Sequence, residues 1–273
     1  MSPRLTVLSI VATVVASLPL TAAEDPAPPP PVGKPTLFIV GDSTVKNGTR
    51  GQQGWGDPIA RFFDKARINV ENHAIGGRSS RTFQTDGRWD RILDKAKPGD
   101  FVLIQMGHND AGKINDDSRA RGSLPGLGEE TQEIDNLITK KHEVVRTYGW
   151  YMRKYITDAR AKGMTPIVCS PIPHVPRKKV EAGEMEDNRY VRWSEELARN
   201  QTAAFIHLNK ITMGHYAGMT PEEVKAKYFT EADNTHTSPA GAELNAASVV
   251  EGIRGLKDCP LATYLLEETA PAK

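Results

Sequence analysis

Serine, aspartate and histidine residues of this chain follow patterns that could support acyl transfer. Ser43 lies in a Gly-Asp-Ser-Thr turn directly after a short apolar run, residues 37–40. A serine at such a strand-to-helix turn can present its hydroxyl to a ligand. Asp233 and His236 lie three residues apart, just before a helix signal at Ser238-Pro239. A carboxylate at that spacing can fix the tautomer of the imidazole while the other ring nitrogen faces a serine.

Two further turns could add hydrogen-bond donors to these residues. In residues 75–79 (Ile-Gly-Gly-Arg-Ser), Gly77 could present its backbone N–H with no side chain in the way, and in residues 107–110 (Gly-His-Asn-Asp), Asn109 could offer its amide. With the N–H of Ser43, these three neutral donors are the set that stabilises a tetrahedral oxyanion. The alternative is that the glycines serve only tight turns and that Asn109 caps a loop.

The spacing of Asp233 and His236 also occurs in metal sites. No further histidine, aspartate or glutamate set with suitable ligand spacing lies near them in the sequence. We therefore expect neither a metal nor a cofactor.

Short apolar runs that alternate with helical patterns predict the elements that hold these residues. Continuous apolar runs are typical of strands buried on both faces of a parallel sheet. Runs span residues 37–40, 68–70, 101–104, 166–169 and 204–208, and helical stretches span residues 58–66, 88–96, 143–162, 189–199 and 239–256. The alternation predicts an α/β fold, a three-layer α/β/α sandwich whose ligands bind at the carboxyl ends of the strands.

Sequence signals mark two helix boundaries and one insertion. Ser238 followed by Pro239 is an N-cap with proline at the first helical position, and Gly163 can close the helix of residues 143–162. Residues 112–141 are polar and rich in Gly, Asp and Glu. We expect them to form a surface insertion beside the end of the third strand.

The overall charge and the cysteine count exclude some classes of protein. The 273 residues include 35 Lys and Arg against 34 Asp and Glu, a formal net charge of +1. A nucleic-acid binder would need a basic excess, so we expect no nucleic-acid partner. Cys169 and Cys259 could pair in an oxidising compartment, but nothing in the sequence brings them together, and a buried free Cys169 is favoured.

The N-terminus has the pattern of a secretory signal peptide. Arg4 precedes an apolar stretch, residues 5–20, and Thr21-Ala22-Ala23 offers small residues for cleavage. The alternative, a transmembrane anchor, needs about 20 apolar residues, and Pro19 ends the stretch early. We expect removal of residues 1–23 to leave a secreted or periplasmic monomer that carries no formal net charge and no membrane attachment.

The rest of the chain divides into three predicted parts. Residues 24–35 form a proline-rich tether. Residues 36–258 form one folded domain that contains the insertion of residues 112–141, and its length is ample for a sizeable core. Residues 259–273 form a C-terminal tail.

Together, the four turns resemble the conserved blocks of the GDSL or SGNH hydrolases. The block residues are Ser43 in GDST, Gly77 in NHAIGGRSS, Asn109 in GHND and His236 in DNTH, and the resemblance spans about residues 36–256. It implies a flavodoxin-like sandwich with a five-stranded parallel sheet in the order 2-1-3-4-5. It also implies a serine esterase without a cofactor.

Two more strings resemble the rhamnogalacturonan acetylesterase branch of that family. They are GWGD at residues 54–57 and THTSPAGAE at residues 235–243, whereas Thr44 replaces the leucine of the family name. The resemblance implies Ser43, Asp233 and His236 as catalytic residues. It implies the N–H groups of Ser43 and Gly77 and the amide of Asn109 as oxyanion donors.

The same resemblance implies an acetylated polysaccharide or oligosaccharide substrate, in particular a pectic one. Arg78 and Arg81, beside Gly77, could then bind uronate carboxylates by paired hydrogen bonds, although surface ion pairs are an equally good interpretation. His108 could line the pocket. Trp55 could stack on a sugar face, although core packing is the more frequent fate of an aromatic residue.

Other functions stay open at this point. The same chemistry could deacetylate xylan, sialate or a small acetylated metabolite, or serve a general esterase. A lipase is disfavoured because residues 112–141 lack the apolar stretch of an interfacial lid. A non-catalytic carbohydrate-binding protein would need a missing catalytic group, and none is missing.

Overall fold

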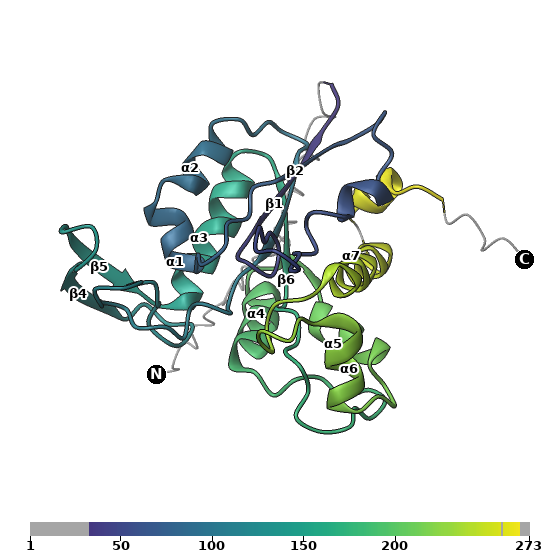
Figure 1. The fold of residues 1–273 in the computed structure, drawn as a ribbon. Coiled ribbons are helices and arrows are strands. Elements are labelled where there is room, and N and C mark those ends of the chain that lie inside the picture. Colours follow the sequence, from purple (N-terminus) through teal and green to yellow (C-terminus); the bar gives the residue numbers. More distant parts are fainter. Residues whose placement is uncertain (1–32, 258, 268–273) are drawn as a thin grey trace, which may run out of the picture.

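The computed structural model describes residues 33–257 and 259–267. A parallel sheet at its centre consists of β1 (Thr36–Gly41), β2 (Asn69–Asn72), β3 (Phe101–Gln105), β6 (Thr165–Cys169) and β7 (Ala204–Ile206) (Figure 1). The spatial order is β2-β1-β3-β6-β7, which reads 2-1-3-4-5 when these five strands alone are numbered. The predicted fold class is therefore confirmed.

The central strands β1, β3 and β6 are buried on both faces, which explains their apolar sequences, whereas the edge strands β2 and β7 are only partly buried. Successive side chains of a strand point to opposite faces of the sheet. Leu37 and Ile39 of β1 accordingly join one hydrophobic cluster, whereas Phe38 and Val40 join the other. Burial of both faces stabilises the sheet by about 25 cal/mol for each Å² of apolar surface removed from water.

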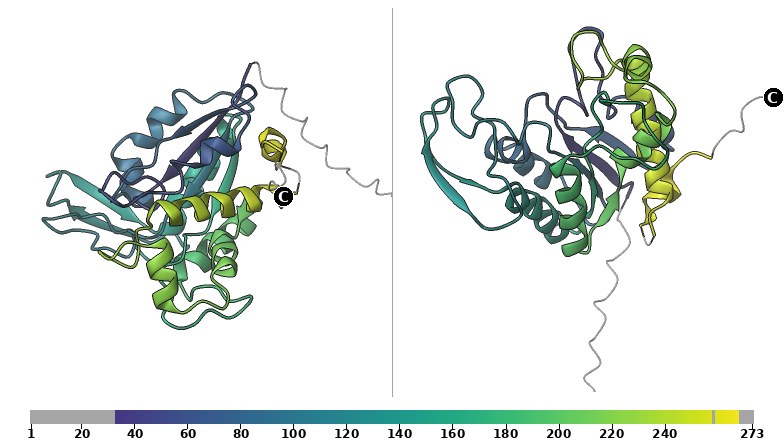
Figure 2. Two further views of the ribbon diagram at one scale, coloured as in Figure 1. Left: turned by 45° about the vertical axis from the view of Figure 1, so that its right-hand side comes forward. Right: turned by 90° about the horizontal axis from the view of Figure 1, so that it is seen from below.

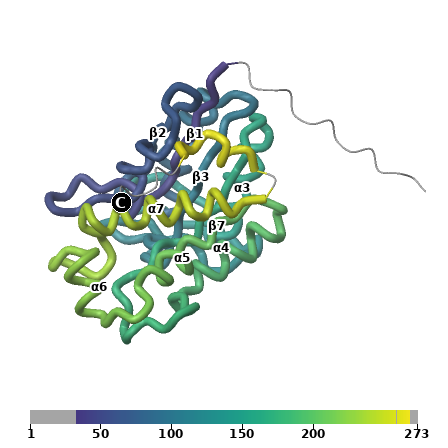
Figure 3. The backbone as a smooth tube through the Cα atoms, turned by 90° about the vertical axis from the view of Figure 1, so that its right-hand side faces the viewer, coloured from purple at the N-terminus to yellow at the C-terminus, as the bar shows by residue number. Residues whose placement is uncertain are grey.

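Helices cover both faces of the sheet (Figures 1 and 3). One layer contains α1 (Ser80–Thr85), α2 (Arg88–Leu93), α3 (Tyr148–Ala161) and α4 (Arg189–Asn200). The opposite layer contains the 3₁₀ helix η1 (Ile59–Phe62), α5 (Leu208–His215), α7 (Pro239–Arg254) and the 3₁₀ helix η2 (Pro260–Tyr264). The helix α6 (Pro221–Tyr228) packs against α7, and a third hydrophobic cluster joins it to α5.

The predicted insertion ends in a β-hairpin that stands apart from the helical layers (Figure 2). Its strands are β4 (Thr131–Asp135) and β5 (His142–Arg146), which pair antiparallel. The helix predicted for residues 143–162 therefore begins too early. The hydroxyl of Thr147 accepts a hydrogen bond from the N–H of Trp150 at 3.0 Å and caps α3. We call residues 112–146 the insertion from here on.

Other helix predictions have mixed outcomes. The hydroxyl of Ser238 accepts from the N–H of Gly241 with Pro239 at the first helical position, and Gly163 follows α3 with φ of +74°. Both predicted boundaries are thus confirmed. The helix predicted for residues 58–66 is only the short η1, and α1, α5 and α6 were not predicted.

The C-terminal segment corrects the predicted tail. In residues 259–267, Leu261 is fully buried in the core, and Leu265 forms a β-bridge with Phe63. This part of the tail therefore belongs to the domain. Cys169 is buried and Cys259 is half-buried, and both are free.

The predicted signal peptide, residues 1–23, and residues 24–32 of the tether lie outside the described residues. In the described parts of the chain, no helix combines the length and the apolar character that crossing a membrane requires.

Candidate active site

Residues Ser43, Gly77 and Asn109 meet at the carboxyl edge of the sheet, as expected from their places after β1, β2 and β3. The turn after β1 is held by Asp42, whose Oδ1 accepts from the N–H and the hydroxyl of Thr44, each at 2.8 Å. These bonds fix the backbone on both sides of Ser43. The serine hydroxyl is thereby directed out of the sheet edge.

A relay of hydrogen bonds joins Ser43 to the segment before α7. The hydroxyl of Ser43 lies 2.8 Å from Nε2 of His236, and Nδ1 of that ring lies 2.7 Å from Oδ2 of Asp233. The serine and the histidine are 193 residues apart in sequence. The geometry is that of a nucleophile, a general base and an orienting carboxylate.

The carboxylate of Asp233 is held in its charged form. Burial by itself raises its pKa, but hydrogen bonds from the ring of His236 and from the N–H groups of His236 and Thr235 outweigh burial and set the pKa at about 2. Gln52 donates a further bond to Oδ2 at 3.3 Å. A carboxylate with this pKa stays ionised at neutral pH and can stabilise a protonated His236.

The donors of the predicted oxyanion hole lie beside the serine. Gly77 has φ of +77°, a conformation that glycine adopts without strain. The amide of Asn109 donates one bond to the carbonyl of Arg78 at 2.8 Å, which leaves its second N–H for a ligand. Among the described residues, no acceptor is bonded to the N–H of Ser43 or of Gly77. The backbone N–H groups of Ser43 and Gly77 and one N–H of the Asn109 amide are therefore free to donate hydrogen bonds to a ligand.

These residues line a cleft with a volume of about 970 Å³. Its walls come from the turn after β1, the segment between β2 and α1, and the insertion. They include Ser43, His236, Gly77, Asn109, Gln52, Lys46, Arg78, Asp86, Arg119, Arg121, Asn136, Ile138, Lys141, His142 and Glu143. Such a volume can hold an extended polar ligand.

Two of the predicted substrate-binding residues lie in the interior instead. Trp55 is fully buried, and its Nε1 donates to Oε1 of Gln105 at 2.8 Å. His108 is only 4% exposed and forms an ion pair of 3.4 Å with the buried Asp42, which raises the pKa of His108 against the lowering effect of its burial. The predictions of substrate contact for Trp55 and His108 are therefore wrong.

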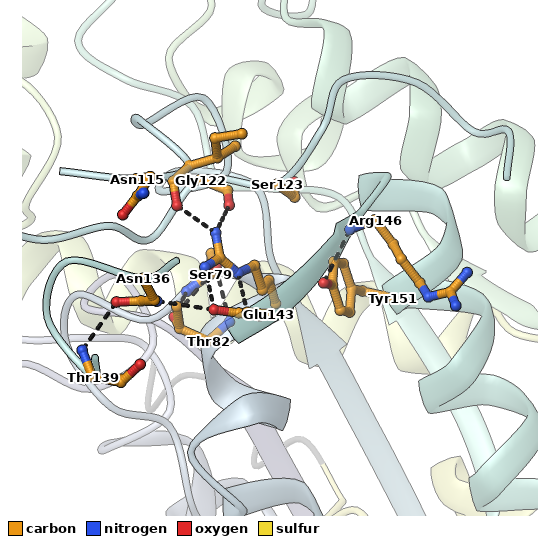
Figure 4. A network of polar contacts seen from close by, with 12 residues as sticks. Ser79, Thr82, Asn115, Gly122, Ser123, Asn136, Thr139, Glu143, Arg146 and Tyr151 are labelled. Carbon is orange, nitrogen blue, oxygen red and sulfur yellow. Dashed lines mark hydrogen bonds and ion pairs between the residues drawn. The ribbon is translucent and has the colours of Figure 1, made fainter. Parts of the chain in front are cut away.

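Arg81 is likewise a structural residue. It is fully buried and forms a bidentate ion pair with Glu143 of β5, with N–O distances of 2.6 and 2.7 Å. Its Nη1 also donates to the carbonyls of Ile114 and Gly122 (Figure 4). All of these contacts tie the insertion to α1, so the prediction that Arg81 binds substrate is wrong.

Arg78 does line the cleft, but it has an acidic partner. Its Nε lies 2.6 Å from Oδ2 of Asp86, and Arg88 approaches the same carboxylate at 3.5 Å. The ion-pair interpretation of Arg78 therefore describes the structure.

Several cleft residues were missed at the sequence level. Lys46 follows the serine turn, and Arg119, Arg121 and Lys141 come from the insertion. No motif marks them, and only the place of Arg119, Arg121 and Lys141 in a polar insertion beside β3 hints at a role. In residues 33–257 and 259–267, no group of three or more His, Cys, Asp or Glu side chains is arranged to hold a metal ion.

Comparisons with known proteins agree with this geometry. The profile of the GDSL-like lipase/acylhydrolase family matches residues 39–244. The chain is 30% identical over 220 residues to a rhamnogalacturonan acetylesterase of Emericella nidulans, covering 80% of this chain and 84% of that protein. It is 29% identical over 238 residues to the probable rhamnogalacturonan acetylesterase YesY of Bacillus subtilis, covering 85% of this chain and 98% of that protein.

A solved structure shares the fold. The crystal structure of YxiM from Bacillus subtilis superposes with a TM-score of 0.65 at 25% identity, covering 82% of this chain and 57% of that longer one. The similarity to the acetylesterases and the family profile, which matches most of the chain, point to the same family. The chain belongs to the GDSL-like lipase/acylhydrolase family and is a carboxylic ester hydrolase.

Proposed function

We propose that this protein is a secreted serine esterase that removes O-acetyl groups from a pectic plant cell-wall polysaccharide, rhamnogalacturonan. The observation that carries the proposal is the hydrogen bond of 2.8 Å between Ser43 and His236 at the floor of the open cleft. The names of the relatives from Emericella nidulans and Bacillus subtilis support the substrate. The predicted signal peptide supports export.

Acylation begins at the hydroxyl of Ser43. Its oxygen attacks the carbonyl carbon of the acetyl ester while Nε2 of His236 takes its proton. Asp233 accepts from Nδ1 and stabilises the imidazolium that forms. The negative charge that develops on the carbonyl oxygen receives hydrogen bonds from the N–H groups of Ser43 and Gly77 and from the amide of Asn109.

The tetrahedral intermediate then collapses. The bond between the carbonyl carbon and the sugar oxygen breaks, and His236 gives its proton to that oxygen. The sugar leaves with a free hydroxyl, and the acetyl group stays on Ser43. Water attacks this acetyl-enzyme with His236 again as the base, which releases acetate and restores the serine hydroxyl.

A panel of substrates tests the proposal. Acetate release is measured from acetylated rhamnogalacturonan, acetylated xylan, acetylated sialate and para-nitrophenyl acetate, with a folded Ser43→Ala variant as the control. We expect the highest kcat/KM on rhamnogalacturonan and no acetate release above background from the variant. Higher kcat/KM on xylan or sialate would contradict the substrate.

Covalent labelling tests the nucleophile separately. A serine-directed fluorophosphonate should modify Ser43, which peptide mass spectrometry can locate. Folded protein that stays unlabelled would contradict the catalytic assignment and favour a carbohydrate-binding protein. Export is tested by N-terminal sequencing of protein recovered outside the cytoplasm, which should begin at Glu24.

A further inference from the structure

The wall of the cleft beside Gly77 carries positive charge that the fold does not neutralise. Arg119 and Arg121 both line the cleft. Within residues 33–257 and 259–267, neither guanidinium forms an ion pair with an acidic side chain, and Nη1 of Arg121 donates only a long hydrogen bond of 3.4 Å to the carbonyl of Gly77. Burial and repulsion by Arg119 lower the pKa of Arg121, and this lowering outweighs the attraction of the more distant carboxylates of Asp42 and Asp110, which form no salt bridge with it.

Other arginines near this wall are neutralised. Arg81 pairs with Glu143, and Arg78 pairs with Asp86. Two like charges held together without an acidic partner are unfavourable in the free protein, and an anion between them would relieve the repulsion. Arg119 and Arg121 therefore differ from Arg78 and Arg81 in having no acidic side chain in salt-bridge contact among the described residues, which leaves them available to an anionic ligand.

The loop that carries these two arginines is fixed by hydrogen bonds. Oδ1 of Asp116 accepts from the N–H groups of Ser118, Arg119 and Ala120 at 3.0, 2.6 and 2.8 Å. Further along the loop, the N–H of Gly122 donates to the carbonyl of Lys113 at 2.9 Å. The loop is thus ordered before any ligand arrives, which lowers the entropy cost of binding.

The two ends of this loop are anchored directly at the catalytic edge. The N–H of Gly112 donates to the carbonyl of Asn109 at 3.1 Å, and the N–H of Ser123 donates to the carbonyl of Asp110, also at 3.1 Å. The position of the arginines is therefore set relative to the oxyanion donor Asn109.

Arg121 lies next to the reacting centre without touching Ser43. A Cβ atom placed on Gly77 would lie 3.4 Å from Nη1 of Arg121, and one placed on Gly76 would lie 3.6 Å from Cβ of Ser43. Two consecutive glycines thus separate them, with Gly77 next to the guanidinium of Arg121 and Gly76 next to Ser43. A group bound there would belong to the part of a substrate adjacent to the ester.

We propose that Arg121, together with Arg119, forms a carboxylate subsite that binds a uronate residue next to the acetylated sugar. The planar guanidinium of Arg121 can donate two parallel hydrogen bonds to a carboxylate, while the exposed Arg119 adds charge at the outer side. This subsite rests on the proposed function, because it selects acidic over neutral acetylated glycans for the same serine. Arg121 and Arg119 thus take the role of binding uronate carboxylates that the sequence suggested for Arg78 and Arg81.

Binding to an inactive variant tests the subsite without relying on turnover. In the Ser43→Ala background, unacetylated oligogalacturonate is titrated by calorimetry into the parent and into the Arg121→Gln and Arg119→Gln variants. We expect Arg121→Gln to weaken binding by about 10- to 100-fold, as the loss of hydrogen bonds to a charged group implies. Arg121→Lys keeps the charge but loses the paired geometry, so its affinity should lie between those of the parent and Arg121→Gln.

A remote arginine provides the matched control. Arg199 is exposed at the end of α4, and Arg199→Gln makes the same change of charge away from the cleft. Its affinity for oligogalacturonate should equal that of the parent. Equal affinity in the parent, Arg121→Gln and Arg199→Gln would overturn the subsite, as would an absence of binding by the folded parent.

Kinetics separate a carboxylate subsite from a role in stabilising the oxyanion. In the chain with Ser43 intact, Arg121→Gln should lower kcat/KM for an acidic acetylated glycan about 10- to 100-fold more than for acetylated xylan, mainly through KM. An equal loss on both glycans, carried by kcat, would overturn the subsite. If the parent binds oligogalacturonate through Arg121 yet releases no acetate from any glycan, the proposed function fails and the subsite stands.

Discussion

Replacement of Asn109 by alanine isolates the contribution of one oxyanion donor. The amide of Asn109 is largely buried and donates one bond of 2.8 Å to the carbonyl of Arg78, with the second N–H left for the oxyanion. Loss of one such donor costs about 10²–10³ in kcat, or about 2.7–4 kcal/mol in the transition state. KM should stay close to the parent value, because the bond strengthens only as charge develops on the oxygen.

The structural cost of the same change is smaller. The lost bond to the carbonyl of Arg78 is worth about 1 kcal/mol, and the backbone carbonyl of Asn109 keeps its bond from Gly112. A domain of this size has about 5–15 kcal/mol of stability, so Asn109→Ala should fold. Its Tm should fall by about 2–4 °C.

Hydrolysis of para-nitrophenyl acetate is the suitable assay, since this small ester needs none of the glycan contacts. Circular dichroism and a thermal melt confirm that the variant is folded, and Asn200→Ala, an exposed amide at the end of α4, serves as the matched control. A folded Asn109→Ala that turns over at close to the parent rate would refute the oxyanion assignment. A rise in KM with unchanged kcat would refute it as well, because it would show ground-state binding instead.

Three other changes probe the surroundings of the site. Burial raises the pKa of Asp110 to about 6, although the hydroxyl of Ser123 donates a hydrogen bond to its carboxylate. The stability that Asp110 contributes is therefore complete below about pH 4 and is lost as pH rises through about 6. Denaturant titrations across this range should show a decline in the free energy of unfolding that Asp110→Asn lacks, and parallel curves for the two proteins would contradict this. Asp116→Ala should release the arginine loop and raise KM for acidic acetylated glycans more than for acetylated xylan, and an equal rise for both would argue against the loop's role. Trp55→Phe should destabilise the fold by about 1–3 kcal/mol, because the buried Oε1 of Gln105 loses its hydrogen-bond donor. KM for the glycan should stay unchanged, and a raised KM would indicate that Trp55 contacts the substrate.

The meeting of the candidate catalytic residues at one edge of the sheet could be predicted from local sequence. Ser43 and Asn109 each follow a continuous apolar run, Gly77 follows the shorter and more polar strand β2, and the carboxyl ends of parallel strands come together at one edge. The order of the strands did not follow from those runs and came from the family resemblance. His236 reaches the same edge because Ser238 and Pro239 fix where α7 begins.

The contacts of the charged and aromatic residues could not be predicted from local sequence. Arg81 and Arg78 both lie near Gly77 in sequence, but their partners decide what they do, and Glu143 lies 62 residues from Arg81. Trp55 bonds to Gln105, 50 residues away. Such pairings depend on tertiary packing, which no local pattern reports.

Some helices were missed although their signals are present. α6 begins with a capping box between Thr220 and Glu223 and has Pro221 at its first position, a recognisable helix start in a polar stretch. The predicted helix began at residue 143 instead of Tyr148, because the short segment His-Glu-Val-Val-Arg of residues 142–146 has only two apolar side chains and no clear strand alternation. Only pairing with residues 131–135 decides in favour of the strand.

The ion pair of Arg81, which is fully buried, and Glu143, which lines the cleft, links two parts of the cleft wall. Arg81 belongs to α1, which directly follows the oxyanion glycine, and Glu143 belongs to the hairpin of the insertion. The side chain of Glu143 is 18% exposed, so its removal would cost less than the about 3–5 kcal/mol of a fully buried pair, but it would still leave the buried guanidinium of Arg81 without a carboxylate partner. The position of the insertion relative to Gly77 is therefore strongly held. The chain thus uses one arginine to fix this wall and leaves Arg119 and Arg121, on the same wall, with no acidic partner among the described residues.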